Sequence, residues 1–209
     1  MASDRYRAAG AQSEYQPGSN DAVLANRLGI TDPADMAEAE LVLLDKLYQA
    51  VLVKDLPRRH LTVDDLRTWH RRWLGNVYAW AGQDRSVNVS KGVFHFAAAA
   101  QVPRLLGEFE RECLAGVTPC SAQLDDASLA AAIARTHVEF ILIHPFREGN
   151  GRISRVLADV MAVQAGRAPL DYSEWEANKP AYFAAIQQGV SRDYAEMTRL
   201  VTLALGAAA

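Results

Sequence analysis

Apolar side chains recur at intervals of three and four residues along most of the chain, the spacing that predicts amphipathic helices. A first helix is predicted to begin after Asp32-Pro33, because proline suits the first helical position. A second is predicted to begin at Thr62, since threonine caps helix N-termini and a first turn favours the carboxylates of Asp64 and Asp65. The apolar spacing carries this second helix to Gly82.

Helical periodicity returns in the second half of the chain. Residues 125–143 are apolar on nearly all sides, as expected of a helix buried at the centre of a domain. The other helical segments are predicted at residues 98–114, 151–165, 173–189 and 192–205.

Residues 85–96 alternate polar with β-branched side chains and contain a Lys91-Gly92 turn, which predicts a β-hairpin. Residues 1–30 are predicted to form an irregular arm packed on the rest of the chain. The expected fold is therefore a single all-α domain over residues 1–209, a helical bundle with one small hairpin.

The composition narrows the class of protein. A 209-residue chain with 50% hydrophobic and 22% charged residues is not disordered or of low complexity. The net charge of −3 argues against nucleic acid or an anionic membrane as a direct partner. No apolar run approaches the roughly 18 residues of a membrane span, and the polar N-terminal residues do not resemble a signal peptide. With two cysteines and no disulfide framework, the expectation is a cytoplasmic protein.

The segment 143–155, IHPFREGNGRISR, concentrates groups that handle phosphate. Pro145 cannot continue a helix and pushes His144 out of helical geometry, so the imidazole is expected at a helix end with its ring at a loop surface. Gly149 and Gly151 allow backbone N–H groups to converge where the next helix begins, and a helix N-terminus adds partial positive charge. This combination predicts an anion site, above all for phosphate.

Three charged side chains accompany the two glycines. Arg152 and Arg155 are three residues apart on one helix face, so both guanidinium groups can hold oxygens of one polyphosphate. Glu148 supplies a carboxylate of the kind that holds Mg²⁺.

Each of these features has a simpler interpretation when taken alone. A lone Gly-x-Gly is a weak signal. The segment is not a dinucleotide-binding fingerprint, because a helix precedes it and the third glycine is missing, and it lacks the Gly-Lys-Ser/Thr of a P-loop. His144 could be a packing histidine, as His70 and His137 are expected to be, and the arginines could form a solvated face. The coincidence of base, carboxylate, glycines and paired arginines favours the phosphate site.

The same run resembles the signature of the Fic family, His-x-Phe-x-(Asp/Glu)-Gly-Asn-Gly-Arg-x-x-Arg, with every specified position filled from His144 to Arg155. The resemblance extends over nearly the whole chain. The other segments that carry it are Tyr15-x-Pro-Gly, Leu24 to Gly29, Val77 to Gly82 followed by Arg85, and the hairpin Val87 to Gly92 with Phe96, which the family calls the flap.

The resemblance implies a Fic fold and transfer of AMP from ATP to a Ser, Thr or Tyr hydroxyl of a target protein, with release of pyrophosphate. His144 would be the general base, and Glu148 would hold Mg²⁺ bridging the α- and β-phosphates. The phosphate-binding positions carried over from the family are Gly149, Asn150 and Gly151 for the anion hole and Arg152 and Arg155 for the outer phosphates.

Two further regions are implied by the resemblance. The flap is expected to hold the backbone of the target by strand addition, with Lys91 and Gly92 at its turn near the nucleotide. Residues 182–189, among them Tyr182 and Gln188, are candidates for the adenine pocket.

The resemblance also bears on the branch of the family. The kinase-like Doc branch has lysine in place of the second glycine, so Gly151 favours adenylylation. Many members carry an inhibitory (Ser/Thr)-x-x-x-Glu-(Gly/Asn) helix whose glutamate pairs with the arginine that corresponds to Arg155. No glutamate of this chain has Ser or Thr four residues earlier. The expectation is therefore the brake-less, toxin-like FicT branch.

Such a toxin would be inhibited in trans by a small antitoxin that supplies the glutamate. Brake-less members suggest type II topoisomerase subunits as targets. Two alternatives stay open: a Fic enzyme that transfers another phosphate-containing group, and a toxin–antitoxin binding module without catalysis.

Overall fold

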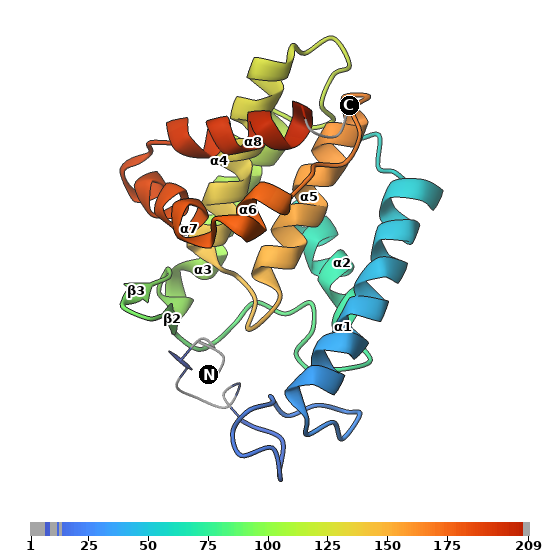
Figure 1. Cartoon of the computed structure of the whole chain (residues 1–209), viewed down its shortest axis with the longest axis vertical. Helices are drawn as coiled ribbons and strands as arrows, with labels where there is room; N and C mark the ends of the chain where they lie inside the picture. Colours follow the sequence, from blue (N-terminus) through green and yellow to red (C-terminus); the bar gives the residue numbers. More distant parts are fainter. Residues whose placement is uncertain (1–6, 9–11, 13, 207–209) are drawn as a thin grey trace.

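Two buried helices lie side by side at the centre of the molecule (Figure 1). Helix α4 spans Asp126–Ile143 and is capped by Asp125, whose carboxylate accepts a hydrogen bond from the Ser128 N–H at 2.7 Å. Helix α5 spans Asn150–Gln164. The phosphate-handling segment 143–155 consists of the last residue of α4, the loop 144–149 that joins the two helices, and the first turns of α5.

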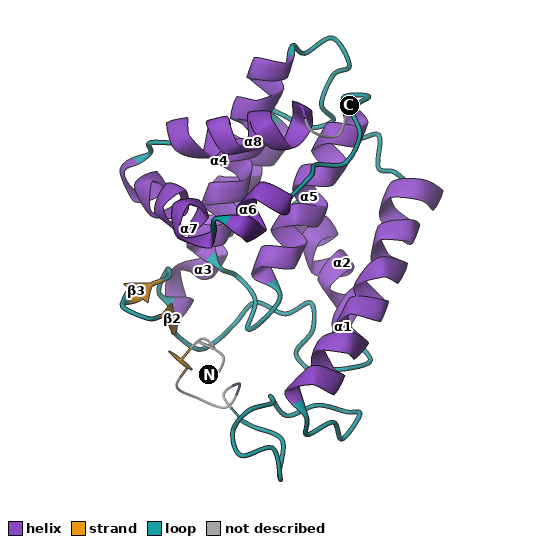
Figure 2. Ribbon diagram, in the orientation of Figure 1, coloured by secondary structure: helices purple, strands orange, loops and turns teal. Residues whose placement is uncertain are grey.

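The computed structural model describes residues 7–8, 12 and 14–206, and most of them are helical (Figure 2). The helices around the central pair are α1 Pro33–Tyr48, α2 Val63–Leu74, α3 Val102–Phe109, α6 Ser173–Ala177, α7 Lys179–Gln188 and α8 Ala195–Gly206. Short 3₁₀ or π segments extend several of them, at Gln49–Lys54, Ala99–Gln101, Glu110–Ala115 and Gly189–Ser191. The predicted fold class, all-α with a small hairpin, is confirmed.

Helix α2 begins at its predicted cap but ends earlier than predicted. Thr62 accepts a hydrogen bond from the N–H three residues on, which completes a capping box. The helix ends at Leu74 and not at Gly82. Val77 and Tyr78 are buried from the turns that follow, with both N–H groups bonded to the Leu74 carbonyl. Their apolar spacing therefore imitates a helical face without belonging to one.

The predicted helix 173–189 is in fact two helices. Asn178 interrupts it with φ −122° and ψ 58°, and its side chain caps α7 by accepting from the Ala181 N–H at 3.4 Å. Pro180 lies in the first turn of α7, a position that tolerates proline, whereas a helix running through it would lose a hydrogen bond.

The predicted hairpin forms from β2 (Val89–Lys91) and β3 (Phe94–His95). A third strand, β1 (Arg7–Ala8), pairs antiparallel with β2 and extends the flap to a three-stranded sheet. This corrects the prediction that residues 1–30 are irregular throughout, although part of that arm lies outside the described residues. A two-residue strand carries no periodicity that a sequence pattern could reveal.

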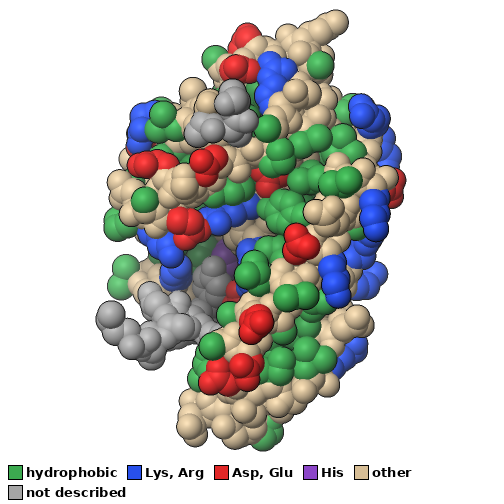
Figure 3. Space-filling model, turned by 45° about the vertical axis from the view of Figure 1, so that its right-hand side comes forward, with side chains coloured by type: hydrophobic (Ala, Val, Ile, Leu, Met, Phe, Trp, Pro, Cys, Tyr) green, Lys and Arg blue, Asp and Glu red, His purple; other side chains and the backbone are tan. Residues whose placement is uncertain are grey.

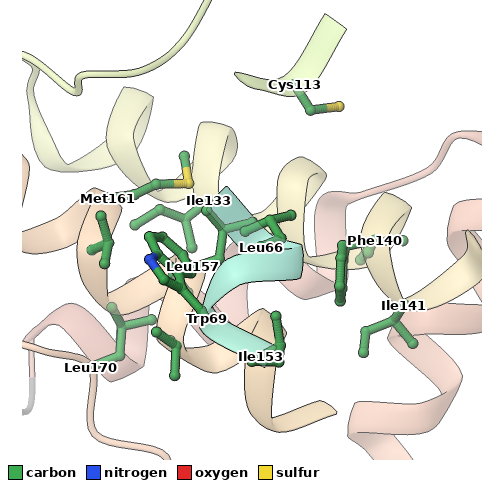
Figure 4. Packing of buried hydrophobic residues seen from close by; sticks show 14 of the residues in the cluster. Leu66, Trp69, Cys113, Ile133, Phe140, Ile141, Ile153, Leu157, Met161 and Leu170 are labelled. Carbon is green, nitrogen blue, oxygen red and sulfur yellow. The ribbon is translucent and has the colours of Figure 1, made fainter. Parts of the chain in front are cut away.

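The apolar core lies where α2, α4 and α5 meet. Trp69 of α2, Ile133 of α4 and Leu157 of α5 point toward one another (Figure 4). Burial of such side chains contributes about 1.5 to 3 kcal/mol each to the free energy of unfolding. In the described part of the chain, no helix is both long enough and apolar enough to cross a bilayer.

Candidate active site

The loop between α4 and α5 is held in place by its own buried groups. His144 closes α4 with a left-handed backbone, φ 53°, so it leaves helical geometry as predicted, in a conformation that is uncommon for a residue other than glycine. The Asn150 side chain accepts a hydrogen bond from the Phe146 N–H and donates one to the Phe146 carbonyl, each at 2.8 Å. The Phe146 ring is buried and stacks on His70, with 4.0 Å between the ring centroids. The side chain of Asn150 is therefore committed to the loop.

The two glycines of the segment have different surroundings. Gly149 has φ 84°, and a Cβ there would lie 2.7 Å from the Trp73 ring, so packing excludes a side chain. Gly151 lines the site cavity, and no described atom beyond its own helical turn lies within 4 Å of the point where its Cβ would be. The fold leaves open space beside Gly151 at the N-terminus of α5, where anions bind.

The His144 ring is buried beneath the flap rather than lying at a loop surface, which corrects the prediction. It stacks on Phe96 of the flap with 3.8 Å between ring centroids. Its Nδ1 lies 3.1 Å from the Ile141 carbonyl. Because a carbonyl only accepts, Nδ1 carries the hydrogen, and Nε2 is the nitrogen that can take up a proton in the neutral ring.

Burial holds His144 in its neutral form. Burial lowers the pKa of His144 to about 3, and the positive charges of Arg85, Lys91 and Arg147 also lower it, against the hydrogen bond to the Ile141 carbonyl, which raises it. At pH 7 the imidazole is therefore unprotonated and can act as a base.

Arg152 is held by a buried carboxylate from α1. Its Nη1 lies 2.8 Å from Glu40 Oε2, and its guanidinium lies over the Trp73 ring at 4.5 Å. Glu40 Oε1 also accepts a hydrogen bond from the Tyr78 hydroxyl at 2.7 Å. The Glu40 side chain is 8% exposed. Arg152 is thus fixed on a buried network that joins α1, α2 and α5.

Arg155 is paired with a more exposed carboxylate than Arg152 is. Its Nη2 lies 2.6 Å from Glu176 Oε1, and its guanidinium lies over the Tyr172 ring at 4.8 Å. The other carboxylate oxygen of Glu176 lies 3.1 Å from Lys179 Nζ. The Glu176 side chain is 48% exposed. The (Ser/Thr)-x-x-x-Glu pattern does not identify Glu176, yet this glutamate contacts Arg155.

Glu148 is positioned by α2. Its carbonyl accepts from His70 Nε2 at 3.0 Å, while His70 Nδ1 accepts from the Gly82 N–H at 2.8 Å, which fixes the ring tautomer. Burial lowers the pKa of His70 to about 4. Glu148 Oε1 accepts from the Gly149 N–H at 2.9 Å. His70 was predicted to pack in the core, and the structure shows that it also holds the segment with the carboxylate.

The donor set suits a magnesium ion that is shared with a substrate. Glu148 lines the cavity. No group of three or more His, Cys, Asp or Glu side chains arranged for a metal occurs among the described residues. Mg²⁺ is commonly held by one or two carboxylates together with waters and substrate phosphates, so a single carboxylate beside an anion site fits it.

These groups surround a cavity of about 550 Å³, within the range of small-molecule sites. In Figure 3, Lys and Arg side chains gather around a hollow in which a histidine is visible. The predicted site residues that line the cavity are Lys91, His144, Glu148, Gly149, Gly151, Arg152, Arg155 and Tyr182. The structure thus brings together one predicted base, one carboxylate, two glycines and two arginines.

Three predicted site residues are absent from the cavity lining. Gly92 lies at the tip of the flap, and the Asn150 side chain is turned toward Phe146. On α7, the neighbouring Gln187 lines the cavity and Gln188 does not. One residue turns a helical side chain by about 100°, so an error of one position along α7 removes the side chain from the cavity.

Several lining residues were not predicted from the sequence. They come from the flap, α4, α6 and the start of α7: Phe94, Ile141, Trp175, Glu176 and Lys179. Phe183, Ile186 and Gln187 also line the cavity and fall within the predicted region 182–189. Lys91 Nζ lies over the Phe183 ring at 4.0 Å and so joins the flap to α7. The Tyr182 hydroxyl lies 2.8 Å from Nε2 of His137, which is buried as predicted.

Comparisons with known proteins agree with this arrangement. The family model described as Fic/DOC family matches residues 60–162. A protein of Sinorhizobium fredii named "Probable protein adenylyltransferase y4lH" is 30% identical over 181 residues, covering 87% of this chain and 89% of that protein. "Probable protein adenylyltransferase Fic" of Escherichia coli is 28% identical over 181 residues and covers 82% of each.

Solved structures share the fold. The N-terminal FIC domain of Bep8 from Bartonella sp. 1-1C superposes with a TM-score of 0.74 at 20% identity, covering 91% of this chain and 94% of that one. BepC from Bartonella tribocorum, solved with bound AMPPNP, superposes with a TM-score of 0.72 at 20% identity, covering 92% and 96%.

Proposed function

The chain belongs to the Fic/DOC family, and on that premise we propose that it is a protein adenylyltransferase, which transfers AMP from ATP to a Ser, Thr or Tyr hydroxyl of a target protein. The observation that carries the proposal is one cavity with two features. His144 is a neutral base on one side, and the open N-terminus of α5 at Gly151 lies on the other.

The reaction uses His144 as the general base. The acceptor hydroxyl gives its proton to Nε2 as its oxygen bonds to the α-phosphorus. The bond between the α-phosphorus and the bridging oxygen breaks, and that oxygen leaves with pyrophosphate. The hydrogen bond from Nδ1 to the Ile141 carbonyl keeps the ring in the tautomer that this step needs.

The first turn of α5 supplies the anion site. Its N–H groups and partial positive charge face the space beside Gly151, where phosphate oxygens fit. Arg155 lines the same cavity and binds the outer phosphates once Glu176 releases it. Arg152 contributes its charge from a fixed position on Glu40. Fixed charges of this kind stabilise the leaving group as its charge develops.

Glu148 is the residue that would hold Mg²⁺. The ion would share the phosphate oxygens with this carboxylate and neutralise part of the charge of the leaving pyrophosphate. Glu148 is suited to this because His70 fixes its backbone and the Gly149 N–H orients its carboxylate.

Gly151 supports AMP as the transferred group. Lysine stands at this position in the kinase-like Doc branch, and the side chain would fill the open space beside the helix N-terminus. The competing functions, transfer of another phosphate-containing group and a binding module without catalysis, lack a specific observation in their favour.

Regulation, target and location form the finer part of the proposal. The chain acts as a toxin restrained in trans by a small antitoxin that supplies a glutamate to Arg155, in the cytoplasm, with type II topoisomerase subunits as targets. Glu176 already contacts Arg155, and this contact is an internal alternative to the antitoxin. An AMP-transfer assay on the purified chain with ATP and Mg²⁺ separates these two kinds of restraint. If the unmodified chain is as active as a Glu176 variant, restraint in trans is supported.

Mass spectrometry of a bacterial lysate tests the activity. Lysate incubated with the purified chain, ATP and Mg²⁺ should acquire adenylyl groups on Ser, Thr or Tyr, and lysate incubated with His144→Ala should not. A different transferred mass, or equal modification by both proteins, would refute the assignment.

A further inference from the structure

Arg85 is a buried guanidinium whose partners are backbone carbonyls. It lies in the loop before β2, is 2% exposed, and is absent from the cavity lining. Its Nε donates to the His144 carbonyl at 2.6 Å, and its Nη2 donates to the Ile143 carbonyl at 3.2 Å. In the described part of the chain, no carboxylate forms an ion pair with it. A buried charge of this kind needs another source of compensation.

The C-terminus of α4 supplies that compensation. The last carbonyls of a helix have no partner within the helix and carry partial negative charge. Arg85 satisfies those of Ile143 and His144, and its own N–H donates to the Pro145 carbonyl at 2.7 Å. Its cation therefore sits against the negative end of the helix that carries the proposed base.

The same guanidinium holds both ends of the flap. Nη1 donates to the Val87 carbonyl at 2.7 Å, just before β2, and Nη2 donates to the Ala97 carbonyl, just after β3. One rigid side chain thus connects the entry and exit of the flap to the backbone of His144. Phe96, between these two anchor points, is the residue that stacks on the His144 ring.

The charges that face His144 come from several elements. Arg85 lies before β2, Lys91 is on β2 and Arg147 is in the α4–α5 loop, and all three lower the pKa of His144. The remaining charged groups that line the cavity are Glu148, Arg152, Arg155, Glu176 and Lys179. Arg85 has the largest effect of the three cations and is the one bonded to the carbonyl of His144 itself.

We infer that Arg85 is a positioning residue for adenylyl transfer, which fixes the flap against the backbone of His144 and places a cation near the imidazole. The effect of Arg85 on catalysis rests on the proposed function. Its effects on the flap and on the His144 ring can be measured without any reaction. The carbonyl partners account for the first effect, and the cation near the imidazole accounts for the second.

Two substitutions separate charge from geometry. Arg85→Gln removes the charge, and Arg85→Lys keeps it while losing the fork that reaches four carbonyls. Arg167→Gln is the matched control. Arg167 also donates to backbone carbonyls, those of Ala165 and Leu124, near the far end of α5 and away from the cavity, although unlike Arg85 it also pairs with a carboxylate, that of Asp126.

Histidine-ring NMR and amide hydrogen exchange give the readouts on the intact chain. In Arg85→Gln, we expect the titration midpoint of His144 to rise by about one pH unit. In Arg85→Lys, it should stay low, while flap amides exchange about tenfold faster. Arg167→Gln should change neither readout. If Arg85→Gln does not fold, the flap amide exchange and the His144 titration of Arg85→Lys test the inference.

An unchanged His144 midpoint in Arg85→Gln, or unchanged flap exchange in Arg85→Lys, would overturn the inference. Absence of AMP transfer by the wild-type chain would instead contradict the proposed function. It would leave the inference about Arg85 testable, since neither the titration nor the exchange depends on turnover. With transfer present, we expect Arg85→Gln to move the acid limb of kcat/KM upward, whereas a purely structural role would lower kcat without moving the pH profile.

Discussion

The carboxylate of Glu176 lies 2.6 Å from a guanidinium nitrogen of Arg155, within the cavity that His144 also lines. If a polyphosphate binds in this cavity, as the proposed function requires, it competes with Glu176 for the same cation. Glu176 is half exposed, and Lys179 lies 3.1 Å from its other oxygen, so the carboxylate has a second partner when it leaves Arg155. The buried pair of Arg152 with Glu40 has no such freedom.

Glu176→Gln should tighten ATP binding. We expect the KM for ATP to fall by about two- to fivefold, because an exposed ion pair contributes at most about 1 kcal/mol. Glu174→Gln, on the same short helix, is the control and should leave KM unchanged. A KM that is unchanged or raised in Glu176→Gln would show that the pair does not compete with phosphate.

Gly149 and Gly151 should respond oppositely to substitution. Gly149→Ala meets the Trp73 ring at a positive φ, so we expect the free energy of unfolding to fall by about 1 to 3 kcal/mol. Gly151→Lys meets no described neighbour, so the fold should keep its stability within about 0.5 kcal/mol while AMP transfer is lost. Urea unfolding and a transfer assay on both variants check this, and normal AMP transfer by Gly151→Lys would contradict it.

Glu40→Gln should cost stability, in contrast to Glu176→Gln. It breaks a largely buried ion pair and leaves the Arg152 guanidinium, over the Trp73 ring, with only the longer 3.6 Å contact to the Glu148 carboxylate. Because Arg152 is one-third exposed, we expect a loss of about 1 to 3 kcal/mol, below that of a fully buried pair. Urea midpoints of the two variants provide the test. Equal midpoints would mean that the buried network around Arg152 adds nothing to stability.

Three buried histidines should make the fold sensitive to mild acid. Burial lowers the pKa of His70 to about 4 and the pKa values of His137 and His144 to about 3. The unfolded chain protonates them below about 6.5, so it binds more protons than the folded chain between pH 6.5 and 4. The free energy of unfolding therefore falls as the pH is lowered through this window.

One buried carboxylate opposes this trend without cancelling it. Burial raises the pKa of Asp159 to about 6, so the folded chain holds an extra proton below that pH. Three histidines against one aspartate leave a net loss of stability. Urea unfolding at pH 7 and pH 5 should show a lower midpoint at pH 5, with a weaker dependence in His137→Gln. A flat profile would contradict the burial of neutral imidazoles.

The segment from His144 to Arg155 could be predicted from the sequence because its geometry is local. A proline follows one helix and two glycines lie at the start of the next, with Glu148 just before them and Arg152 and Arg155 in the first two turns of that helix. Partners that arrive from distant segments leave no such pattern. Glu40 meets Arg152 across more than a hundred residues, and nothing in the spacing around Glu40 signals that contact.

The prediction of the adenine pocket shows the same limit at finer scale. The predicted region on α7 does line the cavity, through Tyr182, Phe183 and Gln187. Which side chains of α7 face the cavity depends on where the helix begins, and the sequence pattern did not reveal the break at Asn178 that sets this start. Arg85 was visible in the sequence as part of a resemblance, but its role follows only from the four carbonyls around it.

On the proposed function, His144 activates a hydroxyl for attack on the α-phosphorus of a nucleotide bound at the start of α5. The most direct test incubates the purified chain and bacterial lysate with ATP labelled at either the α- or the γ-phosphorus. Label should pass to protein only from the α position, and only with His144 intact. Label from the γ position, or equal labelling by His144→Ala, would contradict the account.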